Sequence, residues 1–472
     1  MVTEIVVLGA GPAGLAAAMG LAQAGKKVTV LEQQDHIGGN ATSFDFGGIQ
    51  VDYGSHRLHP AANKEVLDCI QQLLGDDLLT RPRHGRIRLM GRWIHFPLRP
   101  VDLILRMHPR FAFGVGIDML RKILPSTKAG EENETFASIL RQGLGNMICK
   151  EFYFPYARKI WGLEPSDLSP IQARKRISAG SIGKLIKRLL PGGSGGASTK
   201  GIFYYPRHGF GQISLALKNA AIAAGAELHL QANVTKIARM DGGNREVTVE
   251  IDGEERIFLA NQIYSTIPVT ALTRLIDPPA SGEVIKAANS LEFRSMVLVY
   301  VQIDNDQFTE FDAHYFPGSD IPFTRISETK NYTDLEEPKE KTVLCAEIPC
   351  FEGDNIWTMT DEDLGQLVTE GLKAAGIPVN AAVTEVCSRR LSHAYPLYRT
   401  GYEKRFGIVD EWVDCQEGIL SFGRQGLYAH DNTHHAIYMA QAAVKCLNED
   451  GSINELAWNE EKKIFEAHVV ED

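Results

Sequence analysis

The chain has 472 residues, of which 44% are hydrophobic and 23% are charged, and its formal net charge is −10 at pH 7. This length predicts two or three domains, and the composition is typical of a globular α/β enzyme. The acidic balance disfavours a nucleic-acid partner, because phosphate binding requires a concentrated excess of Lys and Arg, and we expect none.

The first predicted strand, Ile5–Leu8, is a continuous apolar run of the kind found in parallel strands that are buried on both faces. It leads directly into a GxGxxG pattern at residues 9–14 and a predicted helix over residues 13–24. The N-terminus of such a helix presents free N–H groups and the positive end of its dipole to an anion. The pattern therefore predicts a dinucleotide pyrophosphate bound at Gly9, Gly11, Pro12, Ala13 and Gly14.

Each glycine of this pattern has a separate task. Gly9 allows the tight turn, Gly11 lets the backbone approach the pyrophosphate, and Gly14 lets the helix pack closely on the strand. A second predicted strand, Lys27–Leu31, is followed by Glu32, whose carboxylate can accept hydrogen bonds from an adenosine ribose. Strand, glycines, helix, strand and acid in this order predict a Rossmann-like fold.

Glycine-rich segments after this acid favour FAD over NAD. Gly38-Gly39 is followed by residues 45–48 (DFGG) and 52–56 (DYGSH), and the arrangement resembles flavoproteins of the amine oxidase and protoporphyrinogen oxidase type. The resemblance implies that this backbone lies against a flavin. The cofactor contacts expected beyond the first helix are Glu32, Gly38, Gly39, Asn40, Gly54, Ser55 and His56, with Val234 further along the chain.

A hairpin that turns at Gly91 is predicted over residues 86–97. Helical periodicity dominates afterwards, and we interpret residues 91–200 as a mostly helical insertion. This insertion ends in a glycine-rich segment, residues 191–198, which is expected to be a flexible linker or lid.

Two stretches of this insertion, residues 101–124 and 182–190, mix apolar and basic side chains at helical spacing. They predict either helices that face the core or a peripheral contact with a membrane. A transmembrane span is not expected, since no uninterrupted apolar run reaches the required length of about 18 residues.

Alternating helix and strand patterns return after residue 200. A helix over residues 211–224 and a strand at 227–230 come first, strands follow between residues 234 and 259, and Ile263–Thr266 is predicted to re-enter the dinucleotide sheet. A strand and turn at 418–424 and a helix at 433–447 are predicted near the end of the sequence.

These patterns predict an α/β protein whose Rossmann-like FAD-binding domain, of the GR2 flavoprotein type, is discontinuous. Its parts are expected to be residues 1–90, 201–270 and 400–472. Residues 271–399 would form a mixed substrate domain, because the strands Val297–Ile303 and Thr342–Ile348 favour an antiparallel sheet.

Several segments together resemble the UDP-galactopyranose mutase branch of this superfamily. Residues 53–59 (YGSHRLH) are similar to its histidine loop, 156–162 (YARKIWG) to its sugar-nucleotide helix, and 323–332 (FTRISETKNY) to the segment whose arginine binds the substrate diphosphate. Residues 395–398 (YPLY) and 423–428 (GRQGLY) are similar to a site segment and to the flavin-contacting turn. The resemblance implies the catalytic residues His56, Tyr156, Trp161, Arg325 and Tyr395, substrate contacts at Arg174, Arg325, Tyr395 and Tyr428, and cofactor contacts at Gly423, Arg424, Tyr428 and Asn432. For the second diphosphate arginine, Arg176 is the alternative to Arg174, because both lie in the expected region without a clear motif.

A structural role is the alternative for each of these residues. Arg325 would then form a surface salt bridge with Glu328 or another acid, and the tyrosines and Trp161 would be packing residues. The chain also departs from the mutases after the last turn, where they usually carry an Asp and this chain reads HDNTHH at residues 430–435. These histidines predict no metal site, because no Cys or acidic cluster completes a coordination shell at this spacing.

Two functions are consistent with these residues. The first, implied by the resemblance, is pyranose–furanose interconversion of a nucleotide-diphosphate sugar through N5 chemistry of a reduced, non-covalently bound FAD. The alternative is an oxidoreductase of the amine oxidase, protoporphyrinogen oxidase or phytoene desaturase kind, in which FAD takes a hydride from an apolar substrate. Seven scattered cysteines without a CxxC pair, and no expected signal peptide, predict reduced thiols in a cytoplasmic protein.

Overall fold

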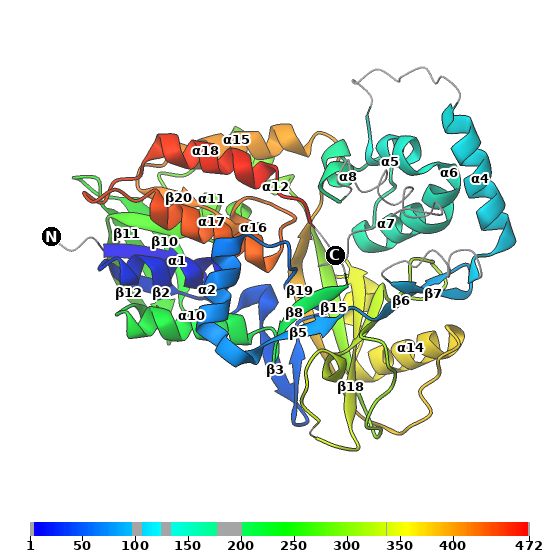
Figure 1. Ribbon diagram of the computed structural model, residues 1–472. Coiled ribbons are helices and arrows are strands. Elements are labelled where there is room, and N and C mark those ends of the chain that lie inside the picture. The colour runs from blue at the N-terminus through cyan, green and yellow to red at the C-terminus, as the bar shows by residue number, and fades with distance from the viewer. Residues whose placement is uncertain (1–3, 97–105, 124–133, 177–200, 337, 471–472) are drawn as a thin grey trace.

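The computed structural model describes residues 4–96, 106–123, 134–176, 201–336 and 338–470. In Figure 1 the left part of the molecule is built on a parallel sheet, and the right part has a large, mostly antiparallel sheet below a group of helices. The predicted glycine-rich segment, residues 191–198, and the amphipathic stretch 182–190 lie outside the described residues.

The parallel sheet is assembled from strands that are far apart in the sequence. Ile263, Tyr264 and Ser265 pair in parallel with Val6, Val7 and Leu8, so the predicted return of the chain to the first sheet is confirmed. The strand order is β20-β13-β1-β2-β9, with bounds β1 Glu4–Leu8, β2 Lys27–Leu31, β9 Glu227–His229, β13 Gln262–Ser265 and β20 Ile419–Ser421.

Three helices cover one face of this sheet, namely α1 (Pro12–Gln23), α10 (Gln212–Ala223) and α17 (Thr433–Lys445). Small side chains allow them to pack closely, and a Cβ on Gly20 of α1 would lie 3.1 Å from Val444 of α17. Apolar residues of β1 are therefore buried on this side without bulky partners.

The opposite face packs on a second sheet, so that β1 is buried on both sides. Val6 and Leu8 share a core with Val247 and Val249 of that sheet. Its order is β12-β11-β10-β14, with bounds β10 Asn233–Arg239, β11 Arg245–Ile251, β12 Glu254–Ala260 and β14 Ile276–Asp277. The nearby helices are α11 Val269–Leu275, α12 Gly282–Asn289 and α15 Tyr402–Asp414.

A seven-stranded sheet forms the other half of the molecule. The two strands predicted from the sequence pair antiparallel, from Ser295 opposite Cys350 to Ile303 opposite Thr342. The predicted hairpin also forms, and it joins this sheet because its first strand pairs with β16. The order is β19-β15-β18-β17-β16-β6-β7, with bounds β6 Gly85–Leu89, β7 Arg92–Phe96, β15 Phe293–Ile303, β16 Ala313–Tyr315, β17 Arg325–Glu328, β18 Thr342–Cys350 and β19 Val383–Pro396.

Both faces of this sheet are covered near its centre. The helix α14 (Asp361–Ala374) packs on one face, and the hairpin of β3 (Ser43–Phe46) and β4 (Ile49–Asp52) packs on the other. Continuous burial along β15 and β18 explains why these strands read as apolar runs and not as alternating patterns.

Helices dominate the described residues between 106 and 176, as the periodicity predicted. They are α4 Pro109–Ile123, α5 Phe136–Leu144, α6 Asn146–Ile148, the π-helical η4 Cys149–Tyr153, α7 Phe154–Trp161 and α8 Pro170–Arg176. Gly162 ends α7 with a positive φ of 66°, which fixes the exit of the chain after Trp161.

The remaining elements connect these layers. They are η1 Gly39–Ala41, α2 Lys64–Leu74, η2 Gly75–Asp77, β5 Leu78–Pro82 paired with β8 Ile202–Pro206, η5 Thr329–Asn331, α13 Asn355–Thr358, α16 Gly423–Gly426 and α18 Glu455–Glu466.

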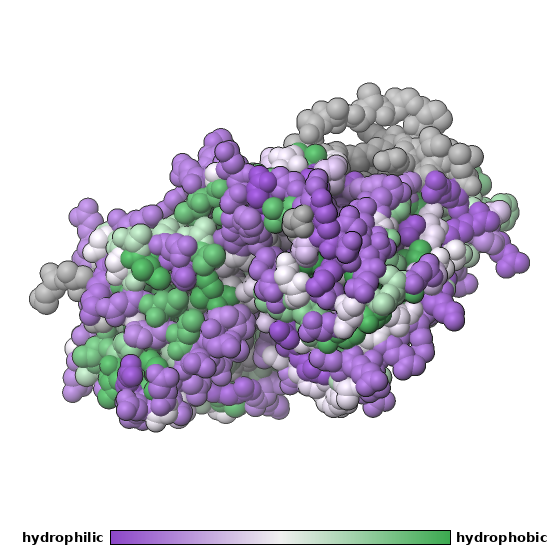
Figure 2. Space-filling view, turned by 90° about the horizontal axis from the view of Figure 1, so that it is seen from below, coloured by the Kyte–Doolittle hydropathy of each residue, from purple (hydrophilic) through white to green (hydrophobic). Residues whose placement is uncertain are grey.

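The surface is mostly hydrophilic on the face shown in Figure 2, with hydrophobic residues gathered mainly on the left half, which holds the parallel sheet. On α4, Phe113 and Leu120 are exposed, so this part of the amphipathic stretch 101–124 does not bury all of its apolar side chains. Among the described residues no helix is both long and apolar enough to cross a membrane. All seven cysteines are free.

Candidate functional site

A cavity of about 860 Å³ lies between the parallel sheet, the large antiparallel sheet and α7. Its wall combines loops that follow β1 and β2, one face of β17 and β18, part of β19 and the segment before α17. Of the predicted site residues, the wall includes Gly9, Gly11, Pro12, Ala13, Glu32, Gly39, Asn40, Ser55, His56, Tyr156, Val234, Arg325, Tyr395, Arg424 and Asn432.

The GxGxxG segment forms one end of the cavity. A Cβ on Gly11 would meet no heavy atom within 4 Å, so this position is open, whereas a Cβ on Gly14 would lie 1.9 Å from the carbonyl oxygen of Gly9. Gly9 itself has a φ of 96°, which favours glycine. The geometry thus leaves Gly11 to a ligand and Gly14 to the packing of α1, as the pattern predicts.

Glu32 lies at the end of β2, beside the start of α1. Its carboxylate accepts a hydrogen bond from the N–H of Ala10 at 2.6 Å and another from the N–H of Gln34 at 2.9 Å. These backbone donors fix the carboxylate on the cavity wall, where Val234 also lies. Glu32 is therefore held in place without a basic side chain.

The glycines after Glu32 connect this end to the middle of the cavity. Gly38 has a φ of 97°, and its N–H donates to the carbonyl of Ala10 at 2.8 Å. Gly39 and Asn40 then line the wall, and the Asn40 side-chain amide donates to the carbonyl of His393 at 3.1 Å.

His56 is a partly buried residue of the wall. Its Nε2 lies 2.9 Å from the carbonyl oxygen of Asn40 and 3.0 Å from that of Tyr53, so this nitrogen carries a hydrogen. Burial lowers the pKa of the imidazole, although Asp52 acts in the opposite direction. The ring stacks on Phe210, with centroids 5.1 Å apart.

Arg325 meets a carboxylate across two strands of the large sheet. It does not pair with Glu328, the partner that a surface salt bridge would have used, but with Glu347. Glu347 also accepts the backbone N–H of Ser55 at 2.8 Å, beside Gly54 with its φ of 91°. Burial is the largest single effect and opposes the charged guanidinium, but Glu347 together with Tyr315, Tyr395 and Tyr332 outweighs it, and the pKa of Arg325 lies above its usual range.

Aromatic rings form another part of the wall. Tyr395 and His430 lie nearly parallel, with centroids 5.9 Å apart and planes 23° apart. Trp161 meets both rings edge-on, at 5.5 Å and 4.8 Å, from a buried position behind the wall. Tyr156 lies on the wall one turn before Trp161. The predicted tyrosine and tryptophan are thus brought to one place, and His430 completes the group.

The turn after β20 packs against the start of α1. Gly423 has a φ of 81°, and a Cβ there would lie 3.0 Å from the Cβ of Ala13. Arg424 donates to the carbonyls of Asp431 and Ala394, and its guanidinium lies 5.2 Å from the ring centroid of Tyr395. Asn432 is the N-cap of α17.

The predicted site residues that do not line the cavity are Gly14, Gly38, Gly54, Trp161, Arg174, Gly423 and Tyr428. For Arg174 and Tyr428 the structure departs from the predicted substrate contact. Arg174 lies on the exposed side of α8, with a side chain that is 59% exposed and paired with Glu134. Tyr428 is buried, and its hydroxyl group bonds to the backbone of Leu397 and Glu292. Side-chain direction, which sequence similarity does not supply, decides both cases.

Arg57, Arg83 and Tyr315 are among the wall residues that were not predicted as site residues. Arg57 stands inside the predicted histidine loop, and its place beside His56 was a usable signal. Arg83 and Tyr315 belong to no motif, so nothing in the sequence pointed to them. All three lie on the cavity wall, and Tyr315 contacts both Arg57 and Arg325.

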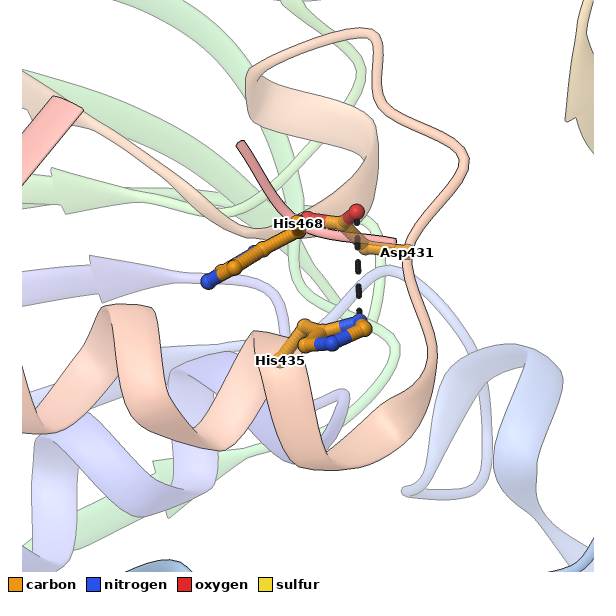
Figure 3. A group of neighbouring side chains, drawn as sticks. All are labelled: Asp431, His435 and His468. Atoms are coloured by element: carbon orange, nitrogen blue, oxygen red, sulfur yellow. Dashed lines mark hydrogen bonds and ion pairs between the residues drawn. The ribbon is translucent and has the colours of Figure 1, made fainter. Parts of the chain in front are cut away.

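Asp431, His435 and His468 gather beside the cavity, with one ligand atom from each within 4.8 Å of the others (Figure 3). His468 donates from Nδ1 to Asp431 at 3.2 Å, and His435 accepts the N–H of Asn432 at 3.2 Å. The two imidazole rings are stacked, 4.3 Å and 16° apart. Because a ring nitrogen directs its lone pair in the ring plane, nearly parallel rings do not converge on one ion. This geometry favours a hydrogen-bonded cluster over a metal centre.

The residues of the wall fit FAD. The open position at Gly11, the N-terminus of α1 and the carboxylate of Glu32 suit a pyrophosphate and a ribose. The adjoining loop of Gly39, Asn40 and His56 continues the wall.

The family model for flavin containing amine oxidoreductase matches residues 12–443. A probable UDP-galactopyranose mutase of Klebsiella pneumoniae is 27% identical over 181 residues, which cover 37% of this chain and 44% of that protein. The chain thus matches less than half the length of this curated relative.

Two solved structures share the fold. A crystal structure of reduced UDP-galactopyranose mutase superposes with a TM-score of 0.78 at 19% identity, covering 94% of this chain and 93% of the other. A proposed protoporphyrinogen oxidase from Exiguobacterium sp. 255-15 has a TM-score of 0.74 at 20% identity, covering 94% and 98%. At this identity the two likenesses concern the fold alone.

Proposed function

The chain belongs to the family of flavin-containing amine oxidoreductases, and within this family we propose that it is a FAD-dependent enzyme that interconverts the pyranose and furanose forms of a nucleotide-diphosphate sugar. The fold shared with reduced UDP-galactopyranose mutase supports this proposal. The main observation in favour of this proposal is the excess of positively charged side chains on the cavity wall.

Positive side chains outnumber negative ones on this wall. It contains seven arginines but only three carboxylates, in a protein whose net charge is negative. The arginines are Arg57, Arg83, Arg274, Arg325, Arg389, Arg390 and Arg424, and the carboxylates are Glu32, Glu347 and Asp431. The pyrophosphate of FAD would balance part of this charge, and an anionic substrate would balance more, whereas a cationic amine would be repelled.

Arg325 is suited to hold the substrate diphosphate. Its Nε and Nη2 donate to Glu347, which fixes the plane of the guanidinium and leaves the N–H groups of Nη1 for a ligand. A guanidinium held in this way loses little freedom when it binds phosphate oxygens. Arg325 would keep the diphosphate in place while the sugar ring opens and closes.

The rings of Tyr156, Tyr395 and His430 would form the surface on which the sugar packs. Tyr395 and Tyr156 line the cavity, and the rings of Trp161 and His430 pack against the ring of Tyr395. Reduced FAD, when bound, supplies a nucleophilic N5 atom for chemistry at the anomeric carbon. The chain's own residues orient the sugar and exclude water from it.

Product analysis tests this proposal directly. FAD-loaded protein is reduced with dithionite under anaerobic conditions and mixed with UDP-galactopyranose or UDP-galactofuranose, and the nucleotide sugars are separated by chromatography. We expect conversion with the reduced protein and none with the oxidised protein, and Arg325→Ala should weaken nucleotide-sugar binding without loss of flavin. A wild-type protein that neither converts nor binds nucleotide sugars would contradict the proposal.

An oxidoreductase that takes a hydride from an apolar substrate is the second candidate. The apolar residues of the wall, Ile160, Phe203, Phe210 and Met296, favour it. Under anaerobic conditions an amine, a porphyrinogen or a carotenoid precursor would then bleach the oxidised flavin, and nucleotide sugars would leave the spectrum unchanged.

A further inference from the structure

Arg57 is a buried cation on the cavity wall. Its side chain is 11% exposed, and the guanidinium carbon lies 5.1 Å from the ring centroids of both Phe203 and Tyr332. Two aromatic contacts fix the guanidinium in one orientation and stabilise its charge. Such a residue is ordered before any ligand arrives.

The hydrogen bonds of Arg57 are incomplete. Nη1 donates to the hydroxyl of Tyr315 at 3.3 Å, and Nη2 donates to that of Tyr332 at 3.1 Å. Nη2 also lies 3.3 Å from Asp312. Within the described part of the chain, the buried Nε has no hydrogen-bond partner. Because this nitrogen is closed to solvent, a ligand in the cavity can reach only the 11% of the Arg57 side chain that remains exposed on the wall.

Tyr315 links Arg57 to Arg325. The hydroxyl of Tyr315 accepts from Arg57, while the guanidinium carbon of Arg325 lies 5.8 Å from the ring centroid of the same tyrosine. The two guanidinium groups repel each other, and among the residues that the structure describes each pairs with one carboxylate, Asp312 for Arg57 and Glu347 for Arg325. An anion that contacts both would relieve this repulsion.

We propose that Arg57 and Arg325 together bind one anionic group of the substrate, and that Arg57 is the second substrate-binding arginine of this protein. The identity of that group as a phosphate of the diphosphate rests on the proposed function. Arg174 lies on the exposed surface of α8 and takes no part.

Binding of inorganic pyrophosphate to the FAD-loaded protein tests the assignment. Calorimetry is carried out on wild type, Arg57→Gln, Arg57→Lys and the matched surface variant Arg174→Gln. We expect Arg57→Gln to weaken pyrophosphate binding roughly tenfold or more, because a charge-assisted hydrogen bond is lost. Arg57→Lys keeps the charge but loses the planar guanidinium, which can donate two parallel hydrogen bonds. This variant should bind pyrophosphate with intermediate affinity. Arg174→Gln should bind like wild type.

Loss of Arg57 also leaves Asp312 buried without its cation, so folding needs its own control. The double variant Arg57→Gln/Asp312→Asn removes both charges, and its flavin content and melting temperature should match wild type more closely than those of the single variant. Weak pyrophosphate binding by this double variant supports the proposal. Wild-type affinity in a folded, flavin-loaded Arg57→Gln protein would overturn it, as would a wild-type protein that binds no pyrophosphate.

The same titrations separate this inference from the proposed function. If UDP-galactose binding and conversion survive in Arg57→Gln but are lost in Arg325→Gln, the assignment of Arg57 is wrong and the proposed function stands. If Arg57→Gln loses pyrophosphate binding while wild type fails to convert UDP-galactose, the anion site stands and the proposed reaction is wrong.

Discussion

Arg325 and Glu347 face each other from adjacent antiparallel strands, and the guanidinium donates from Nε and from Nη2 to the two carboxylate oxygens, both at 2.9 Å. The pair is largely buried, with side chains 20% and 5% exposed. Glu347 also binds the N–H of Ser55, so it connects the large sheet to the histidine loop. Replacement of either partner leaves the other as a buried, unpaired charge.

Glu347→Gln should therefore destabilise the protein by about 3 kcal/mol, because Arg325 stays charged in a site that cannot solvate it. Urea denaturation of the FAD-loaded protein measures this loss. In the double variant Glu347→Gln/Arg325→Gln part of the stability should return, and a double-mutant cycle gives the coupling energy. Additive effects of the two changes would show that the pair is not coupled.

Two glycines of the same turn should separate cofactor binding from folding. Gly11→Ala adds a Cβ with no heavy atom of the protein within 4 Å, so it should lower FAD affinity roughly tenfold with little loss of stability. Gly14→Ala places a Cβ 1.9 Å from a backbone oxygen and should cost about 2 kcal/mol or more. Flavin fluorescence titration and thermal unfolding of the apoprotein check the two effects. Equal losses in both assays for both variants would contradict this division.

Acid should destabilise the protein through His434. Burial, together with the charges of His435, His59 and His468, lowers the pKa of His434 to about 3. The unfolded chain, with an imidazole pKa near 6.5, binds more protons in this range, so stability falls as the pH decreases from about 6.5, by roughly 1.4 kcal/mol per pH unit for each such group.

His434→Gln removes this contribution. Between pH 6 and pH 4 its unfolding free energy should change less steeply with pH, by about 1 kcal/mol per unit, than that of wild type. Denaturant unfolding at several pH values gives the slope, with His208→Gln as a control for the loss of an exposed histidine. An unchanged slope in His434→Gln would count against a neutral buried imidazole.

His468→Ala should loosen the C-terminal segment. His468 donates to the buried Asp431, and two residues later the N–H of Val470 donates to the carbonyl of Lys175, while Val470 lines the cavity. Loss of the donor leaves Asp431 less well satisfied, at a cost of about 1–3 kcal/mol. We expect a lower melting temperature and faster release of FAD after dilution, followed by flavin fluorescence.

The control is Lys463→Ala, because Lys463 is an exposed residue of the neighbouring helix α18. It should release FAD at the wild-type rate. Identical release by His468→Ala and wild type would show that this segment does not contribute to cofactor retention.

The dinucleotide-binding segment could be predicted because it is encoded locally. The turn at Gly9, the close packing of Gly14 and the placement of Glu32 depend on backbone geometry within about 30 residues. The same holds for the hairpin at Gly91 and for the paired strands β15 and β18, whose apolar runs match their burial.

The substrate side of the cavity could be predicted only in part. Arg325, Tyr156 and Tyr395 were named from their motifs and lie on the wall. Tyr428 was also named from a motif, and Arg174 from its region of the sequence alone, but both side chains point elsewhere. A motif fixes a position along the backbone. It does not fix the direction of a side chain, which depends on the packing around it.

The sequence by itself determined the family of the fold and its cofactor end, because short-range patterns of glycine, burial and charge specify those features. Only the tertiary structure brought Arg57 beside Arg325, His430 beside Tyr395, and His468 beside Asp431. The partners in each pair come from different segments of the chain. Their contacts exist because long-range packing of sheets and helices sets which side chains meet, and no local pattern records that outcome.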